Sequence, residues 1–178
     1  MRGTDVTDFK RVYRTALDND LPSELIIPFE KEADLRYGEN PNQQAALYHI
    51  KGKDYADFID LQSVKKGKGG MSATNLMDVT RALEILKFFS SPSVAVMKHL
   101  IPSGFATQRN ERNLVELYQS ARDADARSAF GSTAVFNAPI DTLTAEEITK
   151  TYVEVVAAPS YEQGVMEILE KKKDMRVL

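Results

Sequence analysis

The sequence predicts an α/β fold, in which a layered sheet carries helices on both faces. Short apolar runs of strand length alternate with longer stretches in which apolar residues recur every three or four positions, the spacing of an amphipathic helix. The 178 residues show no break in composition and no internal repeat. A domain of this length buries roughly 70% of the surface of its unfolded chain, so we expect a single domain around one core.

The composition excludes several classes of protein. The net charge of −3, with 28% charged residues, argues against general affinity for nucleic acid, which needs clustered positive charge. Because the chain has no cysteine, it has no disulfide, thiolate nucleophile or cysteine-bound zinc, and it fits a reducing compartment. No stretch reaches the roughly 18 apolar residues of a membrane-spanning helix, and the N-terminus has no apolar stretch typical of a signal peptide. We expect a cytoplasmic protein with no membrane partner.

The N-terminal part of the chain is predicted to begin with a helix over residues 5–17. Phe9, Tyr13 and Leu17 are spaced by four and share one face of that helix, which favours a docking role. Residues 18–24 are polar, contain a proline and read as a connection.

The middle of the chain contains two loops. Residues 35–44 are rich in Gly, Asn and Pro, which predicts a loop of defined turns, and residues 45–50 form a strand. Residues 65–70 are basic and glycine-rich, but no Gly-Lys-Ser/Thr closes them as in a P-loop, so a mobile, solvated loop is favoured over a phosphate cradle. Residues 72–89 show helical spacing after a serine or threonine cap.

The rest of the chain alternates between strands and helices. A continuous apolar strand over residues 93–97 leads through Lys98 and His99 into a turn over residues 101–104, which contain a proline and a glycine. The later elements are a helix over 113–123, a strand over 132–136, a helix over 144–153, a strand over 155–158, a helix over 161–172 and a strand over 175–178.

The adjacent pair Lys98 and His99 is the first candidate for a functional site. A structural basic pair at a strand end and a base beside a cationic stabiliser fit these residues equally well. A neutral imidazole can accept a proton near pH 7, and an ammonium group can stabilise a developing oxyanion. The two side chains of a regular strand point to opposite faces, so a shared site requires the turn to begin at this pair.

Four further candidates can bind a nucleotide or have a structural role. Arg36 and Tyr37 offer a guanidinium and a ring for a phosphate and a base, or form a surface pair. Gly131 lies in a small turn before a strand, where backbone N–H groups can approach a ligand. Glu154 can accept ribose hydroxyls at a strand edge, or be a solvated carboxylate. We interpret His49 as structural, because no second ligand lies at metal-binding spacing.

Together these segments resemble one family, the AICAR transformylase domain of the bifunctional purine-biosynthesis enzymes that also carry IMP cyclohydrolase. They occur in the family's order and cover residues 25–178, preceded by an N-terminal helix and linker over residues 1–24. The matching stretches are Leu35-Arg36-Tyr37-Gly38-Glu39-Asn40-Pro41 with Gln43, Lys98-His99 with Pro102 and Gly104, Ser128-Ala129-Phe130-Gly131, Glu154 with Ala158-Pro159, and Glu167-Ile168-Leu169-Glu170-Lys171-Lys172-Lys173.

The resemblance implies a three-layer α/β/α fold of the cytidine-deaminase-like kind, present here as one copy of the usual two. It also implies transfer of a formyl group from 10-formyltetrahydrofolate, the co-substrate, to the 5-amino group of AICAR in IMP biosynthesis. In that reaction His99 removes a proton from the amine and Lys98 stabilises the oxyanion, with no metal required. Arg36, Tyr37, Gly131 and Glu154 fall on the family's nucleotide-contacting positions.

Three departures from the family affect what the resemblance implies. Many relatives carry Thr-Asn-Pro-Cys-Gly after the Lys-His pair, whereas this chain has Ile101 and Ser103 in place of the Asn and Cys. The preceding cyclohydrolase domain is missing, and the first helix resembles a self-contained start, so IMP formation is not expected. The second copy, which supplies further site residues across a dimer interface, is also missing. We therefore expect a homo-oligomer or a partner chain that carries the second half.

Two other functions remain open from the sequence. The chain can be a nucleotide-binding module that has lost turnover, or a structural subunit of a split transformylase whose main role is to dimerise.

Overall fold

The structure is a computed structural model that describes residues 26–51 and 62–178. The helix expected over residues 5–17 and the connection over residues 18–24 lie outside the described residues. Within the described part, none of the helices is long and apolar enough to cross a lipid bilayer.

A two-stranded hairpin opens the described part. β1 (Phe29–Leu35) and β2 (Ala45–Ile50) pair antiparallel, so the strand expected over residues 45–50 is confirmed. The loop between them is also confirmed, and the amide of Gly38 donates to the Gln43 carbonyl within it at 2.9 Å. β1 was not predicted, because six of its seven residues are exposed and the strand therefore shows no apolar periodicity.

The main sheet has five strands in the order β4-β3-β5-β6-β7. β3 pairs antiparallel with both β4 and β5, whereas β5, β6 and β7 run parallel. The bounds of these strands are β3 (Ser93–Lys98), β4 (Ile101–Thr107), β5 (Ser132–Phe136), β6 (Val153–Ala157) and β7 (Arg176–Val177). The four strands expected over 93–97, 132–136, 155–158 and 175–178 are therefore present.

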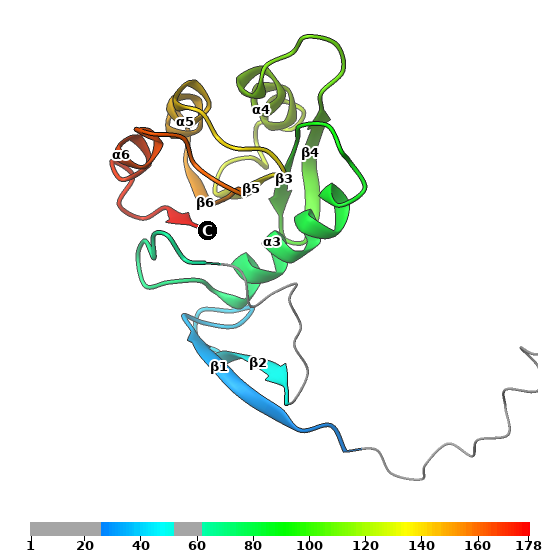
Figure 1. Cartoon of the computed structure of the whole chain (residues 1–178). Coiled ribbons are helices and arrows are strands. Elements are labelled where there is room, and N and C mark those ends of the chain that lie inside the picture. Colours follow the sequence, from blue (N-terminus) through cyan, green and yellow to red (C-terminus); the bar gives the residue numbers. More distant parts are fainter. Residues whose placement is uncertain (1–25, 52–61) are drawn as a thin grey trace, which may run out of the picture.

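Four helices cover the two faces of this sheet, which makes three layers (Figure 1). They are α3 (Ala73–Leu86), α4 (Leu114–Asp123), α5 (Thr142–Thr149) and α6 (Val165–Leu169). α3 packs on one face through Val79, Ala82 and Leu86, and the other three helices bury their apolar sides against the opposite face. The α/β fold with helices on both faces is confirmed, and the assignment to the cytidine-deaminase-like class stays a prediction.

Side-chain caps set where three of the helices begin. Ser72 and Asn113 each form a reciprocal capping box at the start of α3 and α4. Asp141 caps α5 by accepting the amide of Thr144, so this helix begins two residues before the predicted start. α6 is much shorter than the expected helix over 161–172, because turns occupy the residues on either side of it.

The turn expected over residues 101–104 is wrong. These residues open β4, and the chain reverses instead at His99 and Leu100, between the paired residues Lys98 and Ile101. Pro102 is compatible with a strand here because β4 is an edge strand, where a missing N–H breaks no inner ladder. The register shifts between Val96 and Met97, and the bulged Ser103 donates its hydroxyl to the Val96 carbonyl at 3.1 Å.

Candidate functional site

Lys98 is the last residue of β3, and its ammonium group is held by the turn that precedes β5. The Nζ atom donates to the carbonyl oxygens of Phe130 at 3.1 Å and Gly131 at 2.7 Å. An ammonium group has three N–H donors and no acceptor. Since two of the three point to backbone carbonyls, one remains for a ligand.

Gly131 lies where two predicted site residues approach each other. Its φ of +67° is in the left-handed region, and its amide donates to the Tyr152 carbonyl at 2.8 Å. A β-carbon at this position would lie 3.1 Å from the Lys98 Nζ atom and 3.6 Å from a Glu154 carboxylate oxygen. The positive φ therefore favours glycine here, and the cation and the carboxylate approach the same point.

Glu154 comes from β6, which is an inner strand of the sheet. The edge position expected for this residue is therefore wrong, because β6 pairs with β5 on one side and β7 on the other. The Glu154 carboxylate accepts the side-chain amide of Asn75, in the first turn of α3, at 3.2 Å. This contact joins the start of α3 to the start of β6.

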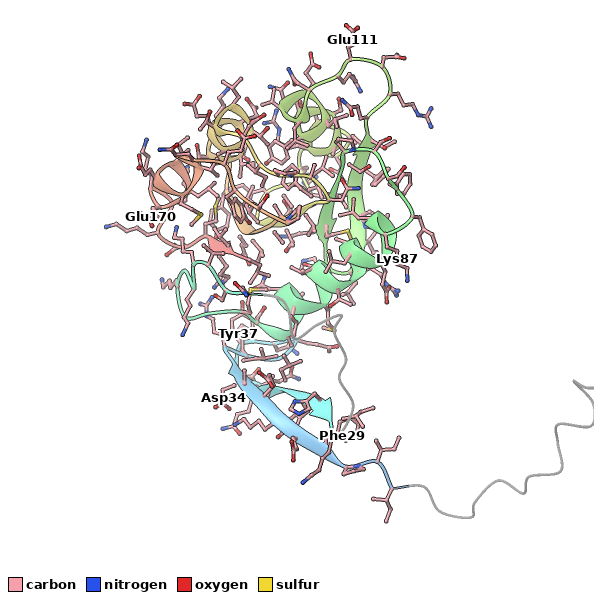
Figure 2. All side chains as sticks on the ribbon, viewed as in Figure 1. Phe29, Asp34, Tyr37, Lys87, Glu111 and Glu170 are labelled. Atoms are coloured by element: carbon pink, nitrogen blue, oxygen red, sulfur yellow. The ribbon has the colours of Figure 1, made fainter. Side chains whose placement is uncertain are left out.

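Arg36 and Tyr37 attach the end of the hairpin to the start of α3. The Arg36 amide donates to the Met71 carbonyl at 2.8 Å, and the Tyr37 carbonyl accepts the Ala73 amide at 2.9 Å. The Arg36 guanidinium lies 5.0 Å from the centre of the Tyr37 ring. Figure 2 shows Tyr37 at the end of the hairpin near α3, whereas Phe29 lies at its far end.

The basic, glycine-rich loop over residues 65–70 lies beside Arg36. A β-carbon on Gly69 would lie 3.3 Å from the Arg36 Nε atom. Arg176 of β7 donates to the carbonyls of Gly70 at 2.5 Å and Lys68 at 2.8 Å, which holds the loop to the main sheet. Whether the loop is mobile or binds phosphate stays a prediction.

Tyr152 connects the two halves of this arrangement electrostatically. Burial raises the pKa of its phenol, the charge of Glu154 raises it further, and the charges of Arg176 and Arg36 act in the opposite direction. Its ring also packs against Phe130, with ring centres 5.2 Å apart.

His99 lies in the turn that follows Lys98. The side chain is exposed, and the φ values of +52° at His99 and +67° at Leu100 form a two-residue hairpin turn. The turn therefore begins at the Lys98–His99 pair, as a site shared by the two side chains requires.

Two buried polar residues of α3, Asn75 and Asp78, belong to this region and were not among the predicted site residues. Both lie on the face of the helix that carries Val79, Ala82 and Leu86 into the core. Asp78 accepts the Leu100 amide at 2.6 Å, and burial raises the pKa of its carboxyl. Their polar character within an apolar helical stripe is the signal that could have identified them.

The predicted residues fall into one group and one separate position. Lys98 contacts Gly131, and Glu154 approaches the same glycine. His99 follows Lys98 in the turn, and Arg36 and Tyr37 are linked to Glu154 through the start of α3. His49 lies apart on β2, where its ring nitrogens face carboxylate oxygens of Glu30 at 3.5 Å and Glu32 at 3.2 Å. Among residues 26–51 and 62–178, no three His, Asp or Glu side chains are placed to hold a metal ion.

This arrangement places an ammonium group, an exposed imidazole and a carboxylate near the Gly131 turn, with the Arg36 guanidinium at the end of the hairpin that contacts the start of α3. An ammonium N–H can stabilise an oxyanion, and an imidazole can move a proton. The carboxylate and guanidinium suit hydroxyl and phosphate groups respectively. Together these groups can stabilise negative charge, move a proton and bind hydroxyl or phosphate groups.

Comparison with known proteins gives a consistent result. Residues 6–178 match the family described as the AICARFT/IMPCHase bienzyme. The chain is 39% identical to the bifunctional purine biosynthesis protein PurH of Acetivibrio thermocellus over 161 residues, which are 90% of this chain and 30% of that protein. It is 38% identical to the PurH protein of Sorangium cellulosum over 157 residues, or 88% of this chain and 30% of that protein. The chain thus spans about a third of the length of these relatives.

Proposed function

Because the chain belongs to the AICARFT/IMPCHase bienzyme family, we propose that it provides the AICAR-binding and proton-transfer part of an AICAR formyltransferase site in purine biosynthesis. The reaction moves a formyl group from 10-formyltetrahydrofolate to the 5-amino group of AICAR. The observation that carries the proposal is the meeting of Lys98, Gly131 and Glu154 at one point, with His99 in the adjoining turn.

The proposed chemistry begins with attack of the AICAR amine on the formyl carbon. A C–N bond forms, and the carbonyl oxygen becomes an oxyanion. This oxyanion accepts a hydrogen bond from the N–H of Lys98 that is not bonded to a backbone carbonyl. His99 takes the proton from the attacking amine. When the bond to N10 of the folate breaks, that nitrogen receives the proton and tetrahydrofolate leaves. No covalent bond to the protein is needed.

Four residues are proposed to bind the nucleotide. The Arg36 guanidinium binds the phosphate, and the Tyr37 ring contacts the base. The Gly131 turn allows close approach of the ligand, and the Glu154 carboxylate accepts ribose hydroxyls. The contact between Glu154 and Asn75 supports this role, because it fixes the carboxylate before a ligand arrives.

A second chain is proposed to complete the site. Leu100, Ile101 and Phe130 expose 40%, 67% and 67% of their surface around the Lys98–His99 pair, and exposed apolar groups of this size are typical of surfaces that another chain covers. The surface is proposed to be covered either by a second copy of this chain or by the remaining part of the family's transformylase region.

Calorimetric titration of the chain with AICAR, alone and with 10-formyltetrahydrofolate present, tests this function. We expect AICAR to bind, and we expect Arg36→Ala to weaken the binding tenfold or more, since a charge-assisted contact to phosphate is worth roughly 1.5–3 kcal/mol. Arg109→Ala is the matched control, because Arg109 is exposed and lies two residues before Glu111, which Figure 2 shows far from Tyr37.

The absorbance change of tetrahydrofolate formation then separates the possible outcomes. Binding without turnover supports a half-site that needs its partner, and binding with turnover shows that the second copy is dispensable. Failure of AICAR to bind, or equal affinity of the Arg36→Ala and Arg109→Ala variants, would overturn the assigned nucleotide site.

A further inference from the structure

Asp78 is a charged side chain that the proposed reaction does not use. It lies in the second turn of α3 with 5% of its surface exposed, between the apolar neighbours that this helix sends into the core. Burying a carboxylate is costly unless specific partners compensate. Its contacts should therefore reveal what the charge does.

The partners of Asp78 come from the turn that carries His99 and from the adjoining strands. One carboxylate oxygen accepts the Leu100 amide at 2.6 Å, which is short for an N–H···O bond. The Thr133 side chain of β5 and the basic side chains of His99 and Lys98 favour the ionised carboxylate, and so act against the rise in pKa that burial causes. All of these partners surround the Lys98–His99 pair.

The turn itself needs an external partner. His99 and Leu100 both have positive φ values, of +52° and +67°, between the paired residues Lys98 and Ile101. Two-residue turns of this kind strongly favour Asn-Gly or Gly-Gly, because a β-carbon disfavours positive φ. A histidine followed by a leucine would not be expected to hold this conformation alone.

We propose that Asp78 is a positioning residue for the Lys98–His99 pair: its carboxylate holds the backbone of the His99–Leu100 turn and thereby fixes the direction of the His99 side chain. The catalytic meaning of this role rests on the proposed function, but the hold on the turn does not. Burial raises the pKa of Asp78, so the ionised carboxylate lowers the stability of the folded chain at neutral pH. Asp78 is therefore not expected to serve stability alone, because its ionised carboxylate makes the folded chain less stable.

The first measurement uses the unmodified chain. As the pH is lowered, the Leu100 amide proton should shift in NMR spectra with the same midpoint as the carboxyl carbon of Asp78, because protonation weakens the bond that joins them. A Leu100 amide that does not respond to this titration would overturn the proposal, whatever the variants do.

The variants then separate the hydrogen bond from general stability. Asp78→Ala removes the acceptor, so the Leu100 amide should exchange with solvent about tenfold faster or more, whereas Asp78→Asn keeps an acceptor oxygen and should stay within about threefold of the original rate. Val79→Ala is the control, since it removes buried volume from the same helix without touching the turn. Equal exchange in Asp78→Ala and Val79→Ala would contradict the hold on the turn.

The role of Asp78 in catalysis is tested by measuring kcat and KM in a complex that transfers formyl groups. Asp78→Ala should lower kcat about tenfold or more and leave KM for AICAR within about threefold, and Asp78→Asn should restore most of kcat. An equal loss in both variants, or a loss confined to KM, would overturn the positioning role. If the unmodified complex fails to bind AICAR while the Leu100 results stand, the proposed function fails and the hold on the turn survives.

Discussion

At the scale of single residues, Lys98 and His99 differ sharply in how the fold constrains them. The Lys98 ammonium is fixed by two carbonyls of the turn before β5, whereas the His99 side chain is exposed on a turn whose backbone is held by α3. An oxyanion stabiliser has to be in place before charge develops. A proton carrier has to reach both the amine and the leaving nitrogen, which an exposed side chain on a fixed turn allows.

The role proposed for His99 predicts that its loss affects turnover but not the binding of AICAR. In a complex that transfers formyl groups, His99→Ala should reduce turnover roughly 100-fold or more, which is the usual contribution of a general base. The affinity for AICAR should stay within about threefold, because Arg36 and Glu154 are untouched. Tetrahydrofolate formation and calorimetry measure the two quantities.

The second histidine of the chain provides the control for this variant. His49 lies on β2 beside Glu30 and Glu32, away from the site. His49→Gln should leave turnover unchanged. Unchanged turnover in His99→Ala would remove His99 from the reaction.

The residues of the site were predictable to different degrees. Lys98 and His99 stood out because they follow an apolar strand. For Arg36 and Glu154 the residues left nucleotide binding and a structural role open, and the resemblance to the transformylase family favoured nucleotide binding. Asp78 and Asn75 were not found, because helical periodicity treats α3 as an amphipathic unit and does not reveal which strand end meets its polar positions. Only the packing of α3 on β3 and β5 brings these side chains to the turn.

At the scale of elements, β4 differs most from the prediction, because a turn was expected where the strand begins. Pro102 and Gly104 are strong turn signals in the sequence, but each fits a strand for a separate reason. Pro102 lies on a sheet edge, and Gly104 is the point where α4 approaches the strand. β1 was missed for a different reason, since an exposed hairpin lacks the apolar alternation that identifies a half-buried strand.

The contact between β4 and α4 predicts a strong effect of Gly104→Ala. A β-carbon at this position would overlap the Ala121 carbonyl oxygen, which is backbone and cannot rotate away. The strand and the helix would have to separate, at a cost of about 2–3 kcal/mol in the free energy of unfolding. Urea unfolding monitored by circular dichroism measures this change.

Gly70→Ala is the matched comparison for this variant. A methyl group there meets no atom within 4 Å, although φ is +78°, so the expected loss is the smaller one of backbone strain, roughly 1–2 kcal/mol. A loss in Gly104→Ala no larger than that in Gly70→Ala would show that β4 and α4 separate easily.

At the scale of the whole molecule, the helices within residues 26–51 and 62–178 cover the two faces of the sheet unequally. Among these residues, α3 alone packs on one face, where Asn75 and Asp78 lie, and three helices cover the other. The three-helix side is joined by a charged contact between α4 and α5, in which Glu147 accepts Arg122 at 2.5 Å and Lys150 at 2.6 Å. Asn75 and Asp78 of α3 and the Glu147 contact between α4 and α5 therefore lie on opposite faces of the sheet.

The stability of the molecule should depend on pH through Glu147. Hydrogen bonds from Lys150 and then Arg122 lower the pKa of this buried carboxyl from 4.5 to about 2. The folded chain thus holds the ionised form more strongly than the unfolded chain does. This contribution is complete above pH 4.5 and is lost as the pH falls toward 2.

Glu147→Gln should therefore lower the free energy of unfolding by roughly 1–3 kcal/mol at neutral pH. It should also flatten the decline of stability between the two pKa values. Urea unfolding at about pH 7 and about pH 3 measures both effects. Glu146→Gln, at the exposed neighbouring position, should change neither. Parallel pH dependence in the Glu147→Gln and original chains would show that this carboxyl does not govern acid stability.

The assembly of the site from distant segments also has a consequence for the kinetics of folding. The contact between Lys98 and Gly131 joins residues 33 positions apart, and the contact between Asn75 and Glu154 joins residues 79 positions apart. Contacts between distant segments form late, because the loops between them must close first. A collapsed intermediate with its helices in place would thus still lack the ligand site. A nucleotide that binds the proposed site would therefore bind only the folded chain. It would lower the unfolding rate and leave the folding rate unchanged.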